Sequence, residues 1–261
     1  MSLVSLLLVT VPFEQRFLDV LQTAAAAGLC IRLWWTGLYR VYVYFFVYLF
    51  LVVGQNIIPY VVRFDSNAYR DAFLATEGLV ACCYMLIVLE LYSIVLRDLR
   101  GIATVSRRYI RNILAVAIGV SAVLMVFEKT SKGMVARFLI FERVTVLSLV
   151  LFVILISGFL LYYPIRLRRN AIIYSIGYAF YFLMKASALF ITNVDNRWVR
   201  LFDSVRMAAS TACLLFWMFQ LNSAGERVTI TVGHHWKPED EELVLSRLQA
   251  INSTLLKAGR K

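Results

Sequence analysis

The stretch Val41-YVYFFVYLFLVVGQNIIPYV-Val62 decides the fold, because it runs for 22 residues without a charged side chain. A second run of 22 residues, Val144-TVLSLVLFVILISGFLLYYP-Ile165, repeats this pattern later in the chain. A helix needs about 20 consecutive apolar residues to cross the hydrocarbon core of a bilayer. Both runs therefore predict membrane-spanning helices.

The composition of the whole chain agrees with these two runs. Of the 261 residues, 61% are hydrophobic and only 16% are charged, and the mean hydropathy is +0.74. Soluble domains have a more polar composition, so the chain is expected to reside in a lipid bilayer. At about 20 residues a span, the length leaves no room for a separate soluble enzyme domain. We predict an all-α, polytopic bundle in 1–222, with about seven spans at 13–35, 38–62, 69–96, 109–127, 138–165, 170–192 and 198–222.

The basic residues predict the orientation of the bundle. The formal net charge is +11, but the Lys and Arg residues lie mostly in short loops between apolar runs. One alternating set of loops and termini holds 16 of them and the opposite set holds 8. Because loops rich in Lys and Arg stay in the cytoplasm, the amino terminus is predicted outside and the carboxyl terminus inside. This scattered distribution also argues against a nucleic-acid partner, which would require one basic face.

The cytoplasmic tail, 223–261, is predicted to end in an amphipathic helix over about 238–257. Pro238 suits a first helical position, and the acidic run that follows it complements the helix dipole. Apolar residues then recur at helical spacing and form one face: Val244, Leu248, Ile251 and Leu255. This face is interpreted either as a docking surface for a protein partner or as a surface that packs on the bundle or the bilayer.

Charged residues inside the predicted spans are the candidate functional site. Ionisable groups are costly in hydrocarbon and, where they occur, usually serve binding, transport or pairing. Counted along the helices, they fall mostly in the outer half of the bundle: Asp19, Glu77, Glu142, Arg143, Lys185, Asp203 and Arg206. Two interpretations follow: a polar pocket for a small ligand or an ion, or a buried ion-pair network that fixes the helix register.

Several chemistries are disfavoured by the residues that the spans lack. The only histidines, His234 and His235, lie in the tail, which argues against haem ligation within the membrane. The last span has no lysine, and retinal proteins use that span, so retinal at Lys185 is not expected. All four cysteines lie inside apolar runs, and no HExxH, Walker loop or GxSxG motif is present. We expect no metal, no cofactor and no enzymatic activity.

Three short motifs carry a resemblance to a known group of proteins. They are Glu142-Arg143 in the fifth span, Leu89-Glu-Leu-Tyr92 in the third, and Val232-GHHWKPEDE-Glu242 in the tail. Together they resemble uncharacterised seven-helix membrane proteins of Acidobacteria, over nearly the whole chain. The resemblance implies a seven-helix topology in a bacterial inner membrane and implies no activity.

The functional expectation is therefore a non-enzymatic membrane protein. In the leading interpretation it is receptor-like or an accessory subunit, with a charged layer in the outer half of the bundle and a cytoplasmic docking helix. A small-solute or ion transporter is the alternative, and a membrane enzyme is a remote one. The expected partners are the lipid bilayer and a protein that contacts the tail or the bundle.

Overall fold

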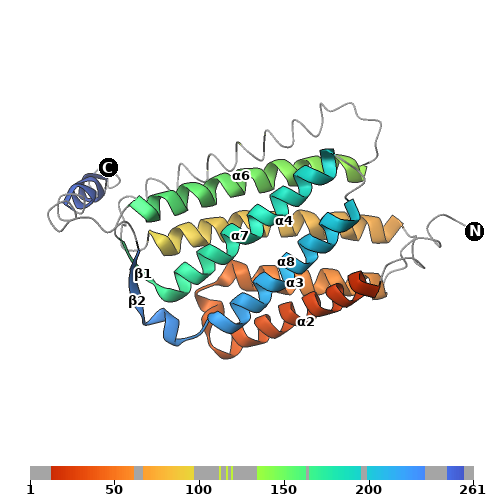
Figure 1. Cartoon of the computed structure of the whole chain (residues 1–261), viewed down its shortest axis with the longest axis horizontal. Coiled ribbons are helices and arrows are strands. Elements are labelled where there is room, and N and C mark those ends of the chain that lie inside the picture. The colour runs from red at the N-terminus through yellow and green to blue at the C-terminus, as the bar shows by residue number, and fades with distance from the viewer. Residues whose placement is uncertain are drawn as a thin grey trace, which may run out of the picture. The chain divides into compact units, whose positions relative to one another are not determined.

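The computed structural model describes residues 13–61, 67–96, 134–162, 165–194, 199–232 and 246–255, together with Asn112, Val116 and Gly119. Within this part of the chain the structure is mostly helical (Figure 1). The long helices are α2 (Phe13–Trp35), α3 (Val43–Val61), α4 (Asn67–Val95), α6 (Met134–Tyr162), α7 (Arg169–Val194) and α8 (Val199–Gln220). Residues 246–255 are also helical. The predicted helical class is confirmed for the residues described.

Three of these helices contain stretches long and apolar enough to cross a membrane: Arg16–Trp35, Leu74–Val95 and Arg169–Ala188. Two further stretches, Val43–Ile58 in α3 and Thr145–Gly158 in α6, are apolar but shorter. Of the predicted span 109–127, only the three isolated residues named above are described. The described residues thus support a membrane protein, while the number of spans and the sidedness of the termini stay predictions.

Several helices carry rows of apolar side chains on their exposed faces. On α6 the exposed side chains include Leu151, Ile154 and Leu155, which recur at helical spacing. On α3 the exposed Val43, Val47 and Phe50 form a similar row. Water-soluble proteins seldom expose contiguous apolar faces of this kind. The exposure pattern therefore agrees with the membrane assignment made from hydropathy.

The chain divides into two compact units. Unit 1 comprises Met1–Tyr84 and Phe180–Gln220, and unit 2 comprises Met85–Ala179 and Leu221–Lys261. In unit 1, α2 packs against both α3 and α8 (Figure 1). Small residues permit the close approach, since Ala25 and Ala26 are buried and a Cβ on Gly28 would lie 3.4 Å from the sulfur of Met218.

A tight turn joins α2 to α3. Gly37 follows α2 in the left-handed conformation, with φ of 70°, and precedes the short 3-10 helix η1 (Leu38–Arg40). Glycine ends helices in this way because it has no Cβ to clash with the backbone. Trp34 and Tyr39 stack across the turn with ring centroids 4.9 Å apart.

Unit 2 contains a two-stranded antiparallel sheet that the all-α prediction omits. Strand β1 (Ile165–Arg168) pairs with β2 (Thr229–Val232), with Leu167 opposite Ile230 (Figure 1). The fifth predicted span was extended to residue 165, but α6 ends at Tyr162. Ile165 instead begins β1, where it pairs with Val232.

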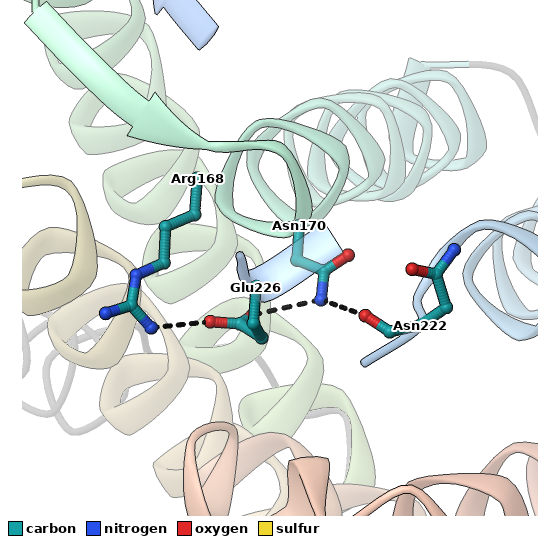
Figure 2. A network of polar contacts seen from close by, with 4 residues as sticks. All are labelled: Arg168, Asn170, Asn222 and Glu226. Carbon is teal, nitrogen blue, oxygen red and sulfur yellow. Dashed lines mark hydrogen bonds and ion pairs between the residues drawn. The ribbon is translucent and has the colours of Figure 1, made fainter. Parts of the chain in front are cut away.

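A polar network fixes the start of α7 to the connection that follows α8. Arg168 forms an ion pair of 2.8 Å with Glu226, which lies in the 3-10 helix η3 (Ala224–Glu226). Asn170 is fully buried, and its Nδ2 donates to the Asn222 carbonyl at 2.7 Å and to Glu226 Oε1 at 3.0 Å (Figure 2). The backbone N–H of Arg169 donates to the Val228 carbonyl at 2.9 Å. We call these contacts the α7 junction.

Gly225 is the tightest point of the α7 junction. A Cβ at this position would meet Asn170 Oδ1, and it would lie 2.8 Å from Asn170 Cγ and 3.3 Å from Asn222 Oδ1. The N–H of Gly225 also donates to Asn222 Oδ1 at 2.7 Å. No side chain larger than hydrogen fits here without moving a hydrogen-bonded partner.

Gly225→Ala is therefore expected to lower the free energy of unfolding by about 1–3 kcal/mol, the usual cost of overpacking. Gly54→Ala is the matched control, because nothing lies within 4 Å of its Cβ position in α3. In a helix interior that change is expected to be neutral or to stabilise by up to about 1 kcal/mol. Unfolding of both purified variants in detergent measures the difference, and equal stability would contradict the packing described for Gly225.

Candidate functional site

Lys185 lies at the centre of the candidate site in unit 1. It occupies α7, and only 6% of its surface is exposed. Its Nζ donates a hydrogen bond of 3.1 Å to the hydroxyl of Tyr84 on α4 and lies 4.5 Å from the centroid of the same ring. A hydrogen bond and a cation–π contact to one tyrosine stabilise an ammonium group away from water.

Three tyrosine hydroxyls continue from this lysine as a hydrogen-bonded chain. The Tyr84 hydroxyl lies 2.7 Å from that of Tyr181, which in turn lies 3.1 Å from that of Tyr48. Tyr181 and Lys185 are four residues apart, so both project from one face of α7. Tyr48 and Tyr84 are buried, on α3 and α4. The lysine–tyrosine cluster, defined as Tyr48, Tyr84, Tyr181 and Lys185, thus joins three helices of unit 1.

Aromatic contacts hold the rings of this cluster in place. The Tyr84 ring packs edge-on against Phe182, with centroids 5.5 Å apart, and tilts against Tyr48 at 5.3 Å. Phe45, one turn before Tyr48 on α3, packs edge-on against the buried Trp217 of α8 at 5.0 Å. Edge-to-face pairs of this kind add a fraction of a kcal/mol or more each to the burial of the rings. The hydroxyls are therefore held by packing as well as by hydrogen bonds.

Three further hydrogen bonds join the helices of unit 1. Gln55 on α3 donates to Glu77 on α4 at 2.8 Å. Asn56 on α3 donates to Thr23 on α2 at 2.8 Å, and Gln22 on α2 donates to Ser210 on α8 at 3.2 Å. Polar groups inside hydrocarbon have no water to bind, so they stabilise the bundle where they meet one another. We call these three contacts the amide pairs.

Of the residues that the sequence groups into one charged layer, Glu77 and Lys185 form hydrogen bonds with other helices of unit 1. Glu77 is half-buried and bound by Gln55, whereas Lys185 contacts Tyr84, seven residues or about 10 Å further along α4. Asp19 and Arg206 are exposed, and Glu142 is half-buried on α6 of unit 2. The side chains of Arg143 and Asp203 lie outside the described part of the chain. No contact among the described residues tests the proposed pairing of Asp203 with Arg206.

The tyrosines are the part of the site that the sequence reading missed. Tyr48, Tyr84 and Tyr181 lie within helices, and the sequence alone assigns them no role. A usable signal was present, because Tyr181 precedes the intramembrane Lys185 by four residues. A buried acid, Glu90 in unit 2, accepts a hydrogen bond of 3.0 Å from the fully buried Tyr174.

The predicted docking face of the tail is described only in part. Residues 246–255 are helical, with Leu248 buried, Leu255 half-buried and Ile251 half exposed. Val244 lies outside the described residues. Whether this face docks a protein partner or packs on the bundle or the bilayer stays a prediction.

The described residues define a mostly helical protein with three helices apolar enough to span a membrane. Among these residues, no group of three or more His, Cys, Asp or Glu side chains is placed to hold a metal ion. The chain matches no protein-family model, no curated protein and no solved structure. The site's own geometry therefore carries the functional argument.

The hydroxyl chain makes a measurable prediction about energetic coupling. In a double-mutant cycle, Tyr48→Phe and Tyr181→Phe are expected to couple by about 0.6 kcal/mol and by at most about 1.7 kcal/mol, the mean and the maximum found for hydrogen bonds in membrane bundles. The exposed Tyr44, also on α3, supplies the control: Tyr44→Phe and Tyr181→Phe should add within about 0.5 kcal/mol. Unfolding of the purified variants measures both cycles. Additive effects in the first cycle would contradict the hydrogen bond between the Tyr48 and Tyr181 hydroxyls.

Proposed function

We propose that this chain is a non-enzymatic, multi-pass membrane protein that serves as a receptor-like or accessory subunit. The observation that carries the proposal is the lysine–tyrosine cluster. A buried ionisable residue in a spanning helix is by default a functional-site candidate, because hydrocarbon opposes it unless a function retains it. Lys185 meets that description, and it is held by Tyr84 rather than left in lipid.

The chemistry of the cluster indicates the kind of ligand. A charged ammonium carries donors only, and each tyrosine hydroxyl is both a donor and an acceptor. A small ligand that carries a carboxylate or another group of acceptor oxygens is complementary to this set. Such a ligand would exchange hydrogen bonds with the hydroxyl chain and bring a counter-charge to Lys185. The amide pairs then act as the structural frame of unit 1.

A transporter is the second candidate, and the hydroxyl chain is the observation that favours it. Adjacent hydroxyls within hydrogen-bond distance connect α7 to α3 through Tyr181. Such chains pass protons, because each hydroxyl accepts one proton while donating another. In this version the cluster carries a proton that is coupled to solute movement.

The topology completes the proposal. We propose seven spans with the amino terminus outside and the tail in the cytoplasm, on the basis of the distribution of Lys and Arg residues. The bacterial inner membrane is implied by the resemblance of the motifs and stays a prediction. Residues 246–255 are the proposed contact for a cytoplasmic protein, with Ile251 as its exposed apolar residue.

Native mass spectrometry, from the protein's own membrane in mild detergent, is the first test of the function. A receptor-like protein is expected to carry a stoichiometric small ligand that Lys185→Met releases while the chain stays folded. Arg206→Met is the matched control, because Arg206 is exposed and its loss should leave the ligand bound. An accessory subunit is expected to retain a second chain instead.

The remaining outcomes of that experiment discriminate among the candidates. Ligand that survives Lys185→Met would contradict the cluster as a site. Solute flux in liposomes that depends on a pH gradient, and is lost in Tyr181→Phe, would replace the receptor with the transporter. Turnover of a bound molecule into a product would overturn the non-enzymatic assignment altogether.

The topology is tested by fusions at the end of the tail. Green fluorescent protein joined after Lys261 is expected to fluoresce, since it folds in the cytoplasm. Alkaline phosphatase joined at the same residue should stay inactive, because it needs the outer compartment. An active phosphatase fusion together with a non-fluorescent green fluorescent protein fusion would place the carboxyl terminus outside, contrary to the proposed orientation. Retention of the chain in membranes washed with alkaline carbonate is the accompanying check for spanning helices.

A further inference from the structure

The sheet formed by β1 and β2 has one apolar and one polar face. Residues directly opposite each other in an antiparallel pair project to the same side of the sheet. Leu167 stands opposite Ile230, and Arg168 stands opposite Thr229. Neighbouring positions therefore alternate between an apolar pair and a polar pair. This is the pattern of a sheet that lies between an apolar and an aqueous phase.

Part of the apolar face is left uncovered by the protein. Leu167 is buried, but its cross-strand neighbour Ile230 is 43% exposed and Val228 is 47% exposed. Val228 and Ile230 are two residues apart, so they share one face of the extended chain. A two-stranded sheet alone is marginally stable in water, and apolar side chains exposed to water destabilise it further. A surrounding apolar phase would remove this unfavourable contact with water.

Arginines lie beside these apolar residues. Arg169 and Arg227 are exposed, and the side chain of Arg168 is 36% exposed. The bond from the Arg169 N–H to the Val228 carbonyl places Arg169 next to the residue that follows Arg227. Among the described residues of this patch, three arginines accompany one acid, Glu226, which is paired with Arg168. Guanidinium groups bind phosphate through two parallel hydrogen bonds, so the charge of this patch complements a phosphate-bearing partner.

Covalent continuity places the patch at a fixed depth. β1 ends at Arg168, and α7 begins with the next residue. The stretch Arg169–Ala188 is long and apolar enough to cross a membrane, so its first residue falls at the edge of the hydrocarbon. The headgroup region occupies roughly 5–8 Å on each side of that core. Pairing with β1 then holds β2, and with it Ile230, at the same level.

We propose that the β1–β2 sheet and its flanking arginines form a binding site for anionic phospholipid. Arg169 and Arg227 bind the headgroup phosphate, while Val228 and Ile230 contact the first methylenes of the acyl chains. The α7 junction keeps these groups together, because it fixes the connection after α8 to the first turn of α7. The inference rests on α7 spanning the bilayer, which is part of the proposed function, and it adds a lipid partner of defined charge.

The test compares lipid binding by the full chain in nanodiscs of phosphatidylglycerol mixed with phosphatidylcholine. The double variant Arg169→Gln/Arg227→Gln is expected to lose about thirty-fold in affinity for phosphatidylglycerol, because each arginine near a membrane contributes roughly a fivefold factor. Ile230→Thr keeps a β-branched residue in the strand and is expected to lower the affinity for both lipids. Arg40→Gln, at the exposed Arg40 of η1, is the control and should retain wild-type affinity.

Each other outcome overturns a different statement. An equal loss of phosphatidylglycerol affinity in Arg40→Gln would show that the affinity depends on the general positive charge of the protein, and it would refute a site at the sheet. Equal affinity of the wild-type protein for both lipids would also refute the site. It would leave the membrane-spanning helices of the proposed function unaffected. Loss of a co-purifying protein from the double variant, with lipid affinity unchanged, would reassign the patch to a protein partner. Release of the chain by alkaline carbonate would instead refute the spanning helices on which the proposed function depends.

Discussion

A polar group inside hydrocarbon must find its hydrogen-bond partner within the protein, and the described helices are organised around that constraint. In unit 1, every contact of the amide pairs crosses from one helix to another. The lysine–tyrosine cluster follows the same rule, since its members come from α3, α4 and α7. Apolar side chains cannot specify which helices meet in lipid, because lipid tails are equally apolar. The polar contacts supply that specificity.

The proposed function adds a second role to one of these sets of contacts, the lysine–tyrosine cluster. The Asn56–Thr23 and Gln22–Ser210 pairs join neutral groups and need no charge compensation, whereas Gln55 donates to the carboxyl group of Glu77. Lys185 differs because an ammonium group is far more costly to bury than an amide. Contacts that serve only to hold the helices together could be built from amides and hydroxyls alone. The presence of a lysine on the tyrosine chain is therefore the feature that points beyond structure to a ligand or a proton.

The α7 junction provides hydrogen-bond partners at the start of a helix rather than in its middle. The first turn of a helix leaves backbone donors without partners inside the helix. Here the Arg169 N–H is bound by the Val228 carbonyl, and Asn170 is anchored to the connection after α8. These bonds convert a short, arginine-rich link into an ordered sheet. The exposed Val228, Ile230 and arginines then suit an interface between hydrocarbon and water.

The sequence by itself determined the helical class, because long apolar runs leave the backbone no other way to satisfy its hydrogen bonds in lipid. It also identified Glu77 and Lys185, since an ionisable residue stands out in an apolar run. It did not reveal Tyr84 as the partner of Lys185, because 101 residues separate them and hydroxyls occur throughout the chain. Nor did it reveal β1, because Ile165 read as the last residue of the fifth span and 166–168 as part of a short basic loop. Composition is a local property of the chain, whereas partner choice and strand pairing depend on contacts between distant segments, which only the tertiary structure fixes.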